Sequence, residues 1–335
     1  MNRHFSNTLK LIAFIGFAVL LLWLVLRNQD LELLKSKLQH ANYWFAVVAL
    51  IFALLSNIVR SYRWNQLIKP LGYKPKVVNT FAALMIGYFT NLGIPRLGEV
   101  TRCGALSRYE NISATKLFGT VVVERVVDLI SIFLLLFLVV VLQWNLMIDF
   151  SSQYVFQPLA DKFISLSQKG SSIYIVFTVA VIILIILCWI AFKMFRKSKA
   201  FIKVKELIAG FVDGLKTIRT LEKPWLFLLN TSLIWIMYLL MSYSCFFSFN
   251  ATNHLGLLVG LTVMIMGGFG FVAPVQGGFG AYHAIVTQTL VLYSIDESDG
   301  LAYAFLMHST QTVGVILFGI LSFIILPIYN RKKPA

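Results

Sequence analysis

The chain has 335 residues, of which 59% are hydrophobic and 13% charged, and its formal net charge at pH 7 is +15. Soluble globular domains carry about 25% charged and roughly 45–50% apolar residues, so this composition excludes a water-soluble fold. On a soluble domain such a basic balance would suggest nucleic acid. Here the charges lie mostly in short loops between apolar runs, which indicates orientation in a membrane and attraction to anionic lipid headgroups.

Apolar runs recur along the whole chain, and several have the roughly 20 residues that a helix needs to cross the hydrocarbon layer. The basic start, residues 1–10, precedes the first run and has no small-residue cleavage site, so we expect a retained first span rather than a signal peptide. The runs lie at about 11–26, 43–59, 77–94, 120–142, 173–192, 225–247, 255–273 and 301–327.

Two of these runs are interrupted by helix-breaking residues. NLGIPRLGEV (91–100) contains Gly93, Pro95 and Gly98, and GGFGFVAPVQGGFG (267–280) contains Pro274 among several glycines. Proline removes a helical hydrogen bond, and glycine allows turns that a helix does not. At membrane depth such a backbone persists only where it is buried in protein or lines a wet cavity.

Lysine and arginine counts predict which loops are cytoplasmic. Lysine and arginine are frequent in 60–76, in 193–224 and at the C-terminus. The loops 248–254 and 291–300 contain no lysine or arginine, and 143–172 contains only Lys162 and Lys169. Segments 77–101 and 255–290 must then each enter and return on one side. We therefore expect an all-α polytopic membrane protein with about six full transmembrane helices plus two opposed re-entrant helical hairpins, which is an inverted-repeat-like arrangement. The alternative, in which each broken run crosses fully, places a positive loop outside.

This topology makes residues 1–335 a single integral membrane domain with both termini cytoplasmic. Between the fifth and sixth runs, residues of about 196–223 alternate apolar and basic positions at helical spacing, which predicts an amphipathic connector lying on the cytoplasmic leaflet. Cys103, Cys188 and Cys245 lie far apart in or beside apolar runs, so they are expected to be packing residues.

Charged residues inside the apolar runs are the sharpest functional signal. Each costs about 2.5–3.5 kcal/mol at mid-bilayer, so exposure to lipid without a partner is disfavoured. Three positive and three negative side chains could neutralise one another as a network. Either they are ion pairs that hold the broken hairpin, or they line a polar cavity that takes a headgroup or exchanges a proton. The arginines would suit a phosphate. The set is Arg96, Glu99, Arg102, Glu124, Arg125 and Asp128.

Two further groups of polar residues are candidates. Asn57, Arg60 and Arg63 form a stripe at the cytoplasmic end of the second run, where they either snorkel to the interface or line an entrance for an anionic headgroup. The second broken run offers Gln276, Gly277, Gly278, Tyr282 and His283, and His308 and Gln311 could meet His283. No nucleophile, dinucleotide or metal-ligand spacing is found, so no enzyme activity, metal or cofactor is expected.

The residues together resemble a known family. NLGIPRLGEVTRCGAL (91–106) followed by VVVERVVDLISI (121–132) is similar to the signature of the flippase-like lysylphosphatidylglycerol synthase transmembrane region. RSYRW (60–64) and PVQGGFGAY (274–282) fit its other two characteristic places. The family often carries a Glu where Tyr282 and His283 stand here, so a carboxylate role at that position does not transfer.

The resemblance implies an inner-membrane protein that moves or handles a lipid. Because the chain ends at Ala335, the soluble synthase domain is expected to be absent. We expect a flippase for a lipid or lipid-linked precursor, with anionic or zwitterionic phospholipid or such a precursor as its partner and no nucleic acid; a homo-oligomer or partner enzyme stays open. One alternative is a non-transporting adaptor that binds lipid or a lipid-modifying enzyme. Another is an intramembrane enzyme using Glu99 or Asp128.

Overall fold

A computed structural model describes residues 23–27, 29–94, 97–144, 221–272 and 275–331, together with residues 20 and 157. Every element in these ranges is helical, as the sequence predicts for an all-α membrane protein. The chain forms two compact units, residues 1–136 with 218–335 and residues 137–217. In the second unit, the described part is the last turns of helix α6 and residue 157. Most of the expected span at 11–26, the expected span at 173–192, most of the connector at 196–223, Pro95, Arg96 and the Gln276 side chain lie outside the described residues.

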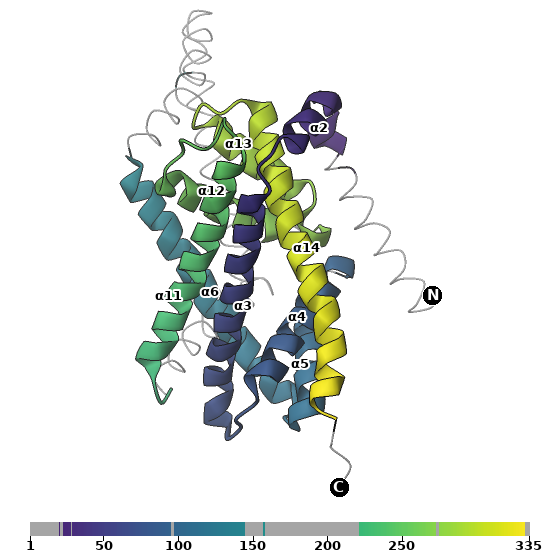
Figure 1. The fold of residues 1–335 in the computed structure, drawn as a ribbon. Coiled ribbons are helices and arrows are strands. Elements are labelled where there is room, and N and C mark those ends of the chain that lie inside the picture. Colours follow the sequence, from purple (N-terminus) through teal and green to yellow (C-terminus); the bar gives the residue numbers. More distant parts are fainter. Residues whose placement is uncertain are drawn as a thin grey trace, which may run out of the picture. The chain divides into compact units, whose positions relative to one another are not determined.

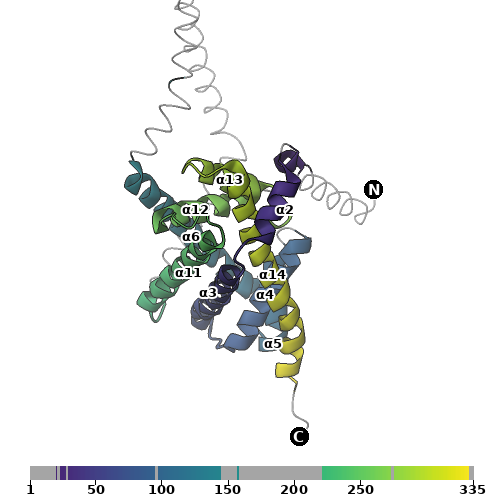
Figure 2. The same cartoon turned by 45° about the horizontal axis from the view of Figure 1, so that its top comes forward.

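Within the described ranges, four helices are long and apolar enough to cross a membrane. They match four of the predicted runs, and the only proline beyond the first turn of any of these α-helices is Pro327, in the last turn of α14. Pro224 occupies the first turn of α11, where its missing N–H costs no helical hydrogen bond. The helices are α3 (Trp44–Ile68, extended by η1, Lys69–Leu71), α6 (Ala114–Leu142), α11 (Pro224–Ser244, extended by η3, Cys245–Ser248) and α14 (Glu297–Tyr329). Figures 1 and 2 both show α3 beside α11.

Contacts between distant residues define two ends of the first unit. At one end Lys69 pairs with Glu222, and Lys76 lies 5.1 Å from the Tyr329 ring centroid. We call this the Lys69 end. At the other, the Asp299 end, the backbone N–H of Asn42 donates to the Ser248 carbonyl at 2.9 Å and Lys37 pairs with Asp299. The short helix α2 (Leu31–Gln39), capped by Asp30, lies at this second end.

The first broken run forms an antiparallel hairpin that opens toward the Lys69 end. It consists of α4 (Val77–Gly93) and α5 (Gly98–Glu110), and Asn79 Nδ2 donates to Glu110 Oε1 at 2.6 Å across its open side. The helices cross at Gly87, where an added Cβ would lie 2.8 Å from the Gly98 carbonyl oxygen. At the closed side, Asn91 Oδ1 accepts the backbone N–H of Gly98 at 2.6 Å, which satisfies one of the free donors at the start of α5.

The second broken run forms a hairpin that opens toward the Asp299 end. It comprises α12 (Leu257–Val272), the short η4 (Gln276–Gly278) and α13 (Ala281–Val291). Tyr293 Oη donates to Thr262 Oγ1 at 3.1 Å near its open side, and a Cβ on Gly270 would lie 2.7 Å from Tyr282 Cα. Gly277, Gly278 and Gly280 all have positive φ, so the turn needs residues without a Cβ.

The closed sides of the two hairpins contact each other inside the unit. Helix α4 packs against η4, and a Cβ on Gly277 would lie 3.5 Å from Leu92 Cδ2. At 1.5 Å per residue, α5 with 13 residues and α13 with 11 are about 20 and 16 Å long, which is less than the roughly 30 Å of hydrocarbon. The structure thus contains two hairpins that open at opposite ends of the first unit. That they are re-entrant in a membrane stays a prediction.

Candidate functional site: a buried arginine–carboxylate network

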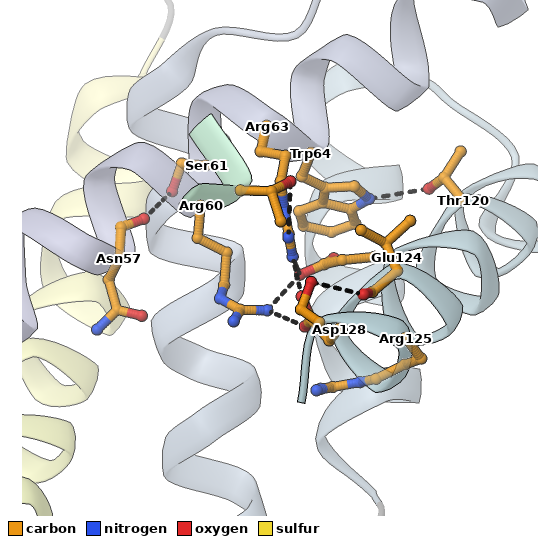
Figure 3. A network of polar contacts seen from close by, with 12 residues as sticks. Asn57, Arg60, Ser61, Arg63, Trp64, Thr120, Glu124, Arg125 and Asp128 are labelled. Atoms are coloured by element: carbon orange, nitrogen blue, oxygen red, sulfur yellow. Dashed lines mark hydrogen bonds and ion pairs between the residues drawn. The ribbon is translucent and has the colours of Figure 1, made fainter. Parts of the chain in front are cut away.

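Five charged side chains from three helices converge inside the first unit (Figure 3). Helix α3 supplies Arg60 and Arg63, α5 supplies Arg102, and α6 supplies Glu124 and Asp128. The three arginines and Glu124 are at most 4% exposed, and the Asp128 side chain is 15% exposed. We call these five residues the arginine network.

Glu124 is the centre of the network because it binds all three arginines. Its Oε1 accepts from Arg60 Nη1 at 2.7 Å and from Arg63 Nη2 at 3.3 Å. Its Oε2 accepts from Arg102 Nη1 at 3.2 Å. One carboxylate thus ties α3 and α5 to α6.

Asp128 lies one turn further along α6, on the same face as Glu124. Its Oδ2 accepts from Arg60 Nη1 at 2.8 Å, and its Oδ1 accepts from Arg63 Nη2 at 2.7 Å. Arg60 and Arg63 therefore each bridge both carboxylates. Both arginines are buried within the protein. They do not snorkel to the membrane interface, which was one of the two interpretations of their position in the sequence.

Neutral residues complete the surroundings of the guanidinium groups. The Arg102 Cζ lies 4.8 Å from the Trp64 ring centroid, and the Trp64 indole donates to Thr120 Oγ1 at 2.9 Å. On α11, Tyr238 Oη accepts from Arg60 Nη2 at 3.1 Å and Thr231 Oγ1 accepts from Arg63 Nη1 at 3.3 Å. Cation–π contact and hydroxyl acceptors lower the cost of burying these cations.

The network carries more positive than negative charge. Three guanidinium groups face two carboxylates, which leaves one positive charge without a counter-charge within the five residues. Among the described residues, Arg102 Nε and Nη2 are buried donors without a hydrogen-bond partner. A buried N–H group without a hydrogen-bond acceptor costs free energy, so the site is suited to a further acceptor. An anionic acceptor would also balance the surplus positive charge.

Arg125 and Glu99 form a separate pair at the margin of the network. Arg125 Nη2 donates to Glu99 Oε1 at 3.1 Å, with side chains 44% and 25% exposed. In Figure 3 no dashed line joins Arg125 to Glu124 or Asp128. Of the six charged residues that were expected to form one neutral network, the five that the structure describes are therefore divided between the arginine network and this separate pair. Neighbouring residues on α6 point about 100° apart, so Arg125 faces α5 while Glu124 faces α3.

Asn57 does not join the arginine network. Its Nδ2 donates to the Ala53 carbonyl at 2.8 Å, one turn back on its own helix, and its Oδ1 is buried without a partner among the described residues. In Figure 3 its side chain extends away from Glu124 and Asp128.

The candidates of the second hairpin form an aromatic and histidine cluster rather than a charged one. Tyr282 and His283 are buried, and the His283 ring centroid lies 4.8 Å from that of His308. His308 Nε2 is 2.7 Å from the Gly277 carbonyl oxygen, which fixes the turn that Gly277 and Gly278 make. The predicted meeting of His283 with His308 is thus present in the structure.

Comparison with known proteins shows the family of the chain. The family model "Lysylphosphatidylglycerol synthase TM region" matches residues 10–319. The chain belongs to this family. Its members are membrane proteins linked to lipid metabolism or transport.

Two relatives are UPF0104 membrane proteins of Methanocaldococcus jannaschii. MJ1595 is 32% identical over 138 residues, which is 40% of this chain and 40% of that protein. MJ1078 is 27% identical over 248 residues, which is 73% of this chain and 97% of that protein. No solved structure matches the chain.

Three residues that contact the guanidinium groups of the arginine network were not predicted from the sequence. They are Trp64, Thr231 and Tyr238. Trp64 follows Arg60 by one helical turn within RSYRW, so its position on the face of Arg60 was a usable signal. Thr231 and Tyr238 had no such signal, because their proximity depends on how α11 packs on α3.

Proposed function

We propose that the chain is a flippase for a lipid or lipid-linked precursor in the bacterial inner membrane, and that the arginine network binds the phosphate of the headgroup. The observation that carries this proposal is the surplus positive charge buried where α5 meets the candidate membrane spans α3 and α6. Keeping a charge there is expensive, so a functional use is the default interpretation of an intramembrane charge cluster.

Arg102 is the residue best suited to bind a phosphate. Its guanidinium has one bond to Glu124, and its Nε and Nη2 remain available. Two donors on one edge of a guanidinium match two phosphate oxygens. Glu124 and Asp128 hold Arg60 and Arg63 in place when no ligand is present.

The two hairpins support transport as the use of this site. They enter the unit from opposite ends and contact each other at Leu92 and Gly277. Opposed broken helices in the two halves of a chain are typical of transporters whose site lies near the bilayer midplane. The concentration of lysines at the Lys69 end favours a cytoplasmic location for that end and for both termini.

Transport by purified protein in liposomes tests the proposal. Wild type should move a fluorescent phospholipid between leaflets, and Arg102→Gln should slow it at least tenfold because the phosphate loses its available guanidinium. Arg108→Gln is the matched control, since Arg108 is an exposed arginine on the same helix that stacks on Tyr109. Equal rates for wild type and Arg102→Gln would contradict the assignment of the site.

The non-transporting adaptor is the second candidate. It is favoured by the closed state of the network, because none of the five residues lines the cavity of about 360 Å³ or the cavity of about 290 Å³ in the described part of the chain. An adaptor would leave lipid movement in the same liposomes at the protein-free rate, while retaining binding of the labelled lipid.

A further inference from the structure

A cavity of about 360 Å³ lies at the Lys69 end, between α3, α11 and the loop that precedes α4. Its polar lining includes Lys69, Lys74, Gln66 and Asn230, and Tyr62 contributes an aromatic wall. The volume is within the range of small-ligand sites, about 300–1,000 Å³. None of these residues belongs to the arginine network.

The surroundings of this cavity are positively charged. Lys69 pairs with Glu222, whose side chain is 59% exposed, so the acid lies at the edge of the cavity and not inside it. The hydrogen bond from Lys69 lowers the pKa of Glu222 below its ordinary value, and Lys74 and Lys223 add to this effect. The local field therefore favours an anion.

The wall of the cavity is fixed by side-chain contacts. Asn65 Nδ2 donates to the Pro75 carbonyl at 3.1 Å, and Thr80 Oγ1 donates to Asn65 Oδ1 at 2.6 Å. Lys116 Nζ lies 5.4 Å from the Tyr73 ring centroid on the far side of the same loop. A loop held in this way keeps Lys74 in position, while Lys69 belongs to η1.

The cavity also lies at the level expected for lipid headgroups. It sits where the candidate membrane span Trp44–Leu71 ends and the span Pro224–Ser248 begins. Trp225 beside it is 81% exposed, and the lining residues Tyr62 and Leu226 are 51% and 42% exposed. Exposed aromatic residues near lysines are typical of the membrane–water interface. An occupant here could place its charge on the lysines and its acyl chains along Tyr62 and Leu226.

We propose that this cavity binds the phosphate-bearing headgroup of an anionic membrane lipid, and we call it the interfacial lipid site. The site and the arginine network contact neighbouring residues of α11. Asn230 Nδ2 donates to Gln66 Oε1 at 3.2 Å, and the next residue, Thr231, accepts from Arg63. The proposal goes beyond the proposed function, because the site binds its lipid whether or not the chain transports it.

Native mass spectrometry of the full chain in detergent, titrated with phosphatidylglycerol or phosphatidylcholine, tests the interfacial lipid site. The wild type should prefer phosphatidylglycerol, and the double variant Lys69→Gln/Lys74→Gln should bind it at least fivefold more weakly. Lys76→Gln is the matched control, because Lys76 stacks on Tyr329 at the same end and does not line the cavity. Equal binding by the double variant and the wild type would overturn the proposal.

Two more variants separate a loss of charge from a loss of folding. Lys69→Arg/Lys74→Arg keeps both charges and should retain binding. Glu222→Gln removes the acid that pairs with Lys69, so it should strengthen binding about two- to threefold, which damage to the fold would not do. Unchanged or weaker binding by Glu222→Gln would contradict the electrostatic basis of the site.

The source of the phosphate and the link to transport are tested by two further arms. Displacement of the lipid by millimolar inorganic phosphate would identify a site for a soluble anion and overturn the lipid assignment. A wild type that moves no lipid in liposomes, yet binds phosphatidylglycerol through Lys69 and Lys74, would contradict the proposed function alone.

Discussion

Glu124 accepts hydrogen bonds from three arginines and has no exposed surface, so at the scale of single residues it determines how the charges are compensated. Removing one partner of a buried ion pair leaves an uncompensated charge, which costs about 3–5 kcal/mol. The consequence depends on the sign of the residue removed. Loss of an acid raises the surplus of positive charge, whereas loss of Arg102 abolishes it.

Glu124→Gln should accordingly destabilise the protein by roughly 3–5 kcal/mol, because three guanidinium groups would then face Asp128 alone. Arg102→Gln should destabilise it less, since two guanidinium groups and two carboxylates remain. Denaturant titration of both variants in the same detergent gives the two changes in the free energy of unfolding. A larger loss for Arg102→Gln would refute the charge count.

The sequence grouped Arg102, Glu124 and Asp128 but did not predict their association with Arg60 and Arg63. The cost of intramembrane charge singles out these residues, because it depends on the residue type and the apolar context alone. Their pairing with Arg60 and Arg63 depends on the approach of α3 to α6, which no local pattern encodes. The separate Glu99–Arg125 pair follows from the same packing. It is a partly exposed pair of the kind that contributes only about 0–1 kcal/mol.

At the scale of elements, the glycines of the first hairpin have two different roles. Gly98 starts α5 at the point where its backbone touches that of α4, and a Cβ there would collide with the Gly87 carbonyl oxygen and the Asn91 side chain. Gly104, two turns further along α5, has open space around it. The sequence identified Gly93, Pro95 and Gly98 as a break in the helix. It did not distinguish a glycine needed for close packing from one that is not.

Gly98→Ala should therefore lower the stability of the protein, by about 1–3 kcal/mol if the helices shift to relieve the overlap. Gly104→Ala should leave it unchanged or raise it by up to about 1 kcal/mol, because alanine is the better helix former. Thermal unfolding in detergent compares the two substitutions on one helix. Equal midpoints would show that α4 and α5 do not approach as closely as the crossing requires.

At the scale of the whole molecule, the sequence predicted two opposed hairpins from loop charges and helix breakers, and the structure contains hairpins that open to opposite ends. Their register could not be predicted, because it depends on contacts such as Gly87 with Gly98. The sidedness of the membrane stays a prediction. Fold class was the most accessible property, since composition and apolar run length alone determine it.

Cysteine labelling tests the topology. On a background without native cysteines, Lys74→Cys and Ser113→Cys flank the first hairpin, and both should react only from the cytoplasm. Asn253→Cys and Asp296→Cys flank the second hairpin and should react only from outside. A membrane-impermeant maleimide added to intact cells and to inverted vesicles makes the comparison. Labelling of Lys74→Cys and Ser113→Cys from opposite faces would show that 77–101 crosses fully.

The contact between Leu92 and Gly277 has a consequence for the membrane voltage. If both hairpins are re-entrant, as the sequence predicts, most of the transmembrane potential should fall across the thin layer where they touch. Moving one elementary charge through 100 mV changes its energy by about 2.3 kcal/mol. A potential that is negative inside would thus drive an anionic headgroup outward past this contact, and a zwitterionic headgroup would experience no such bias.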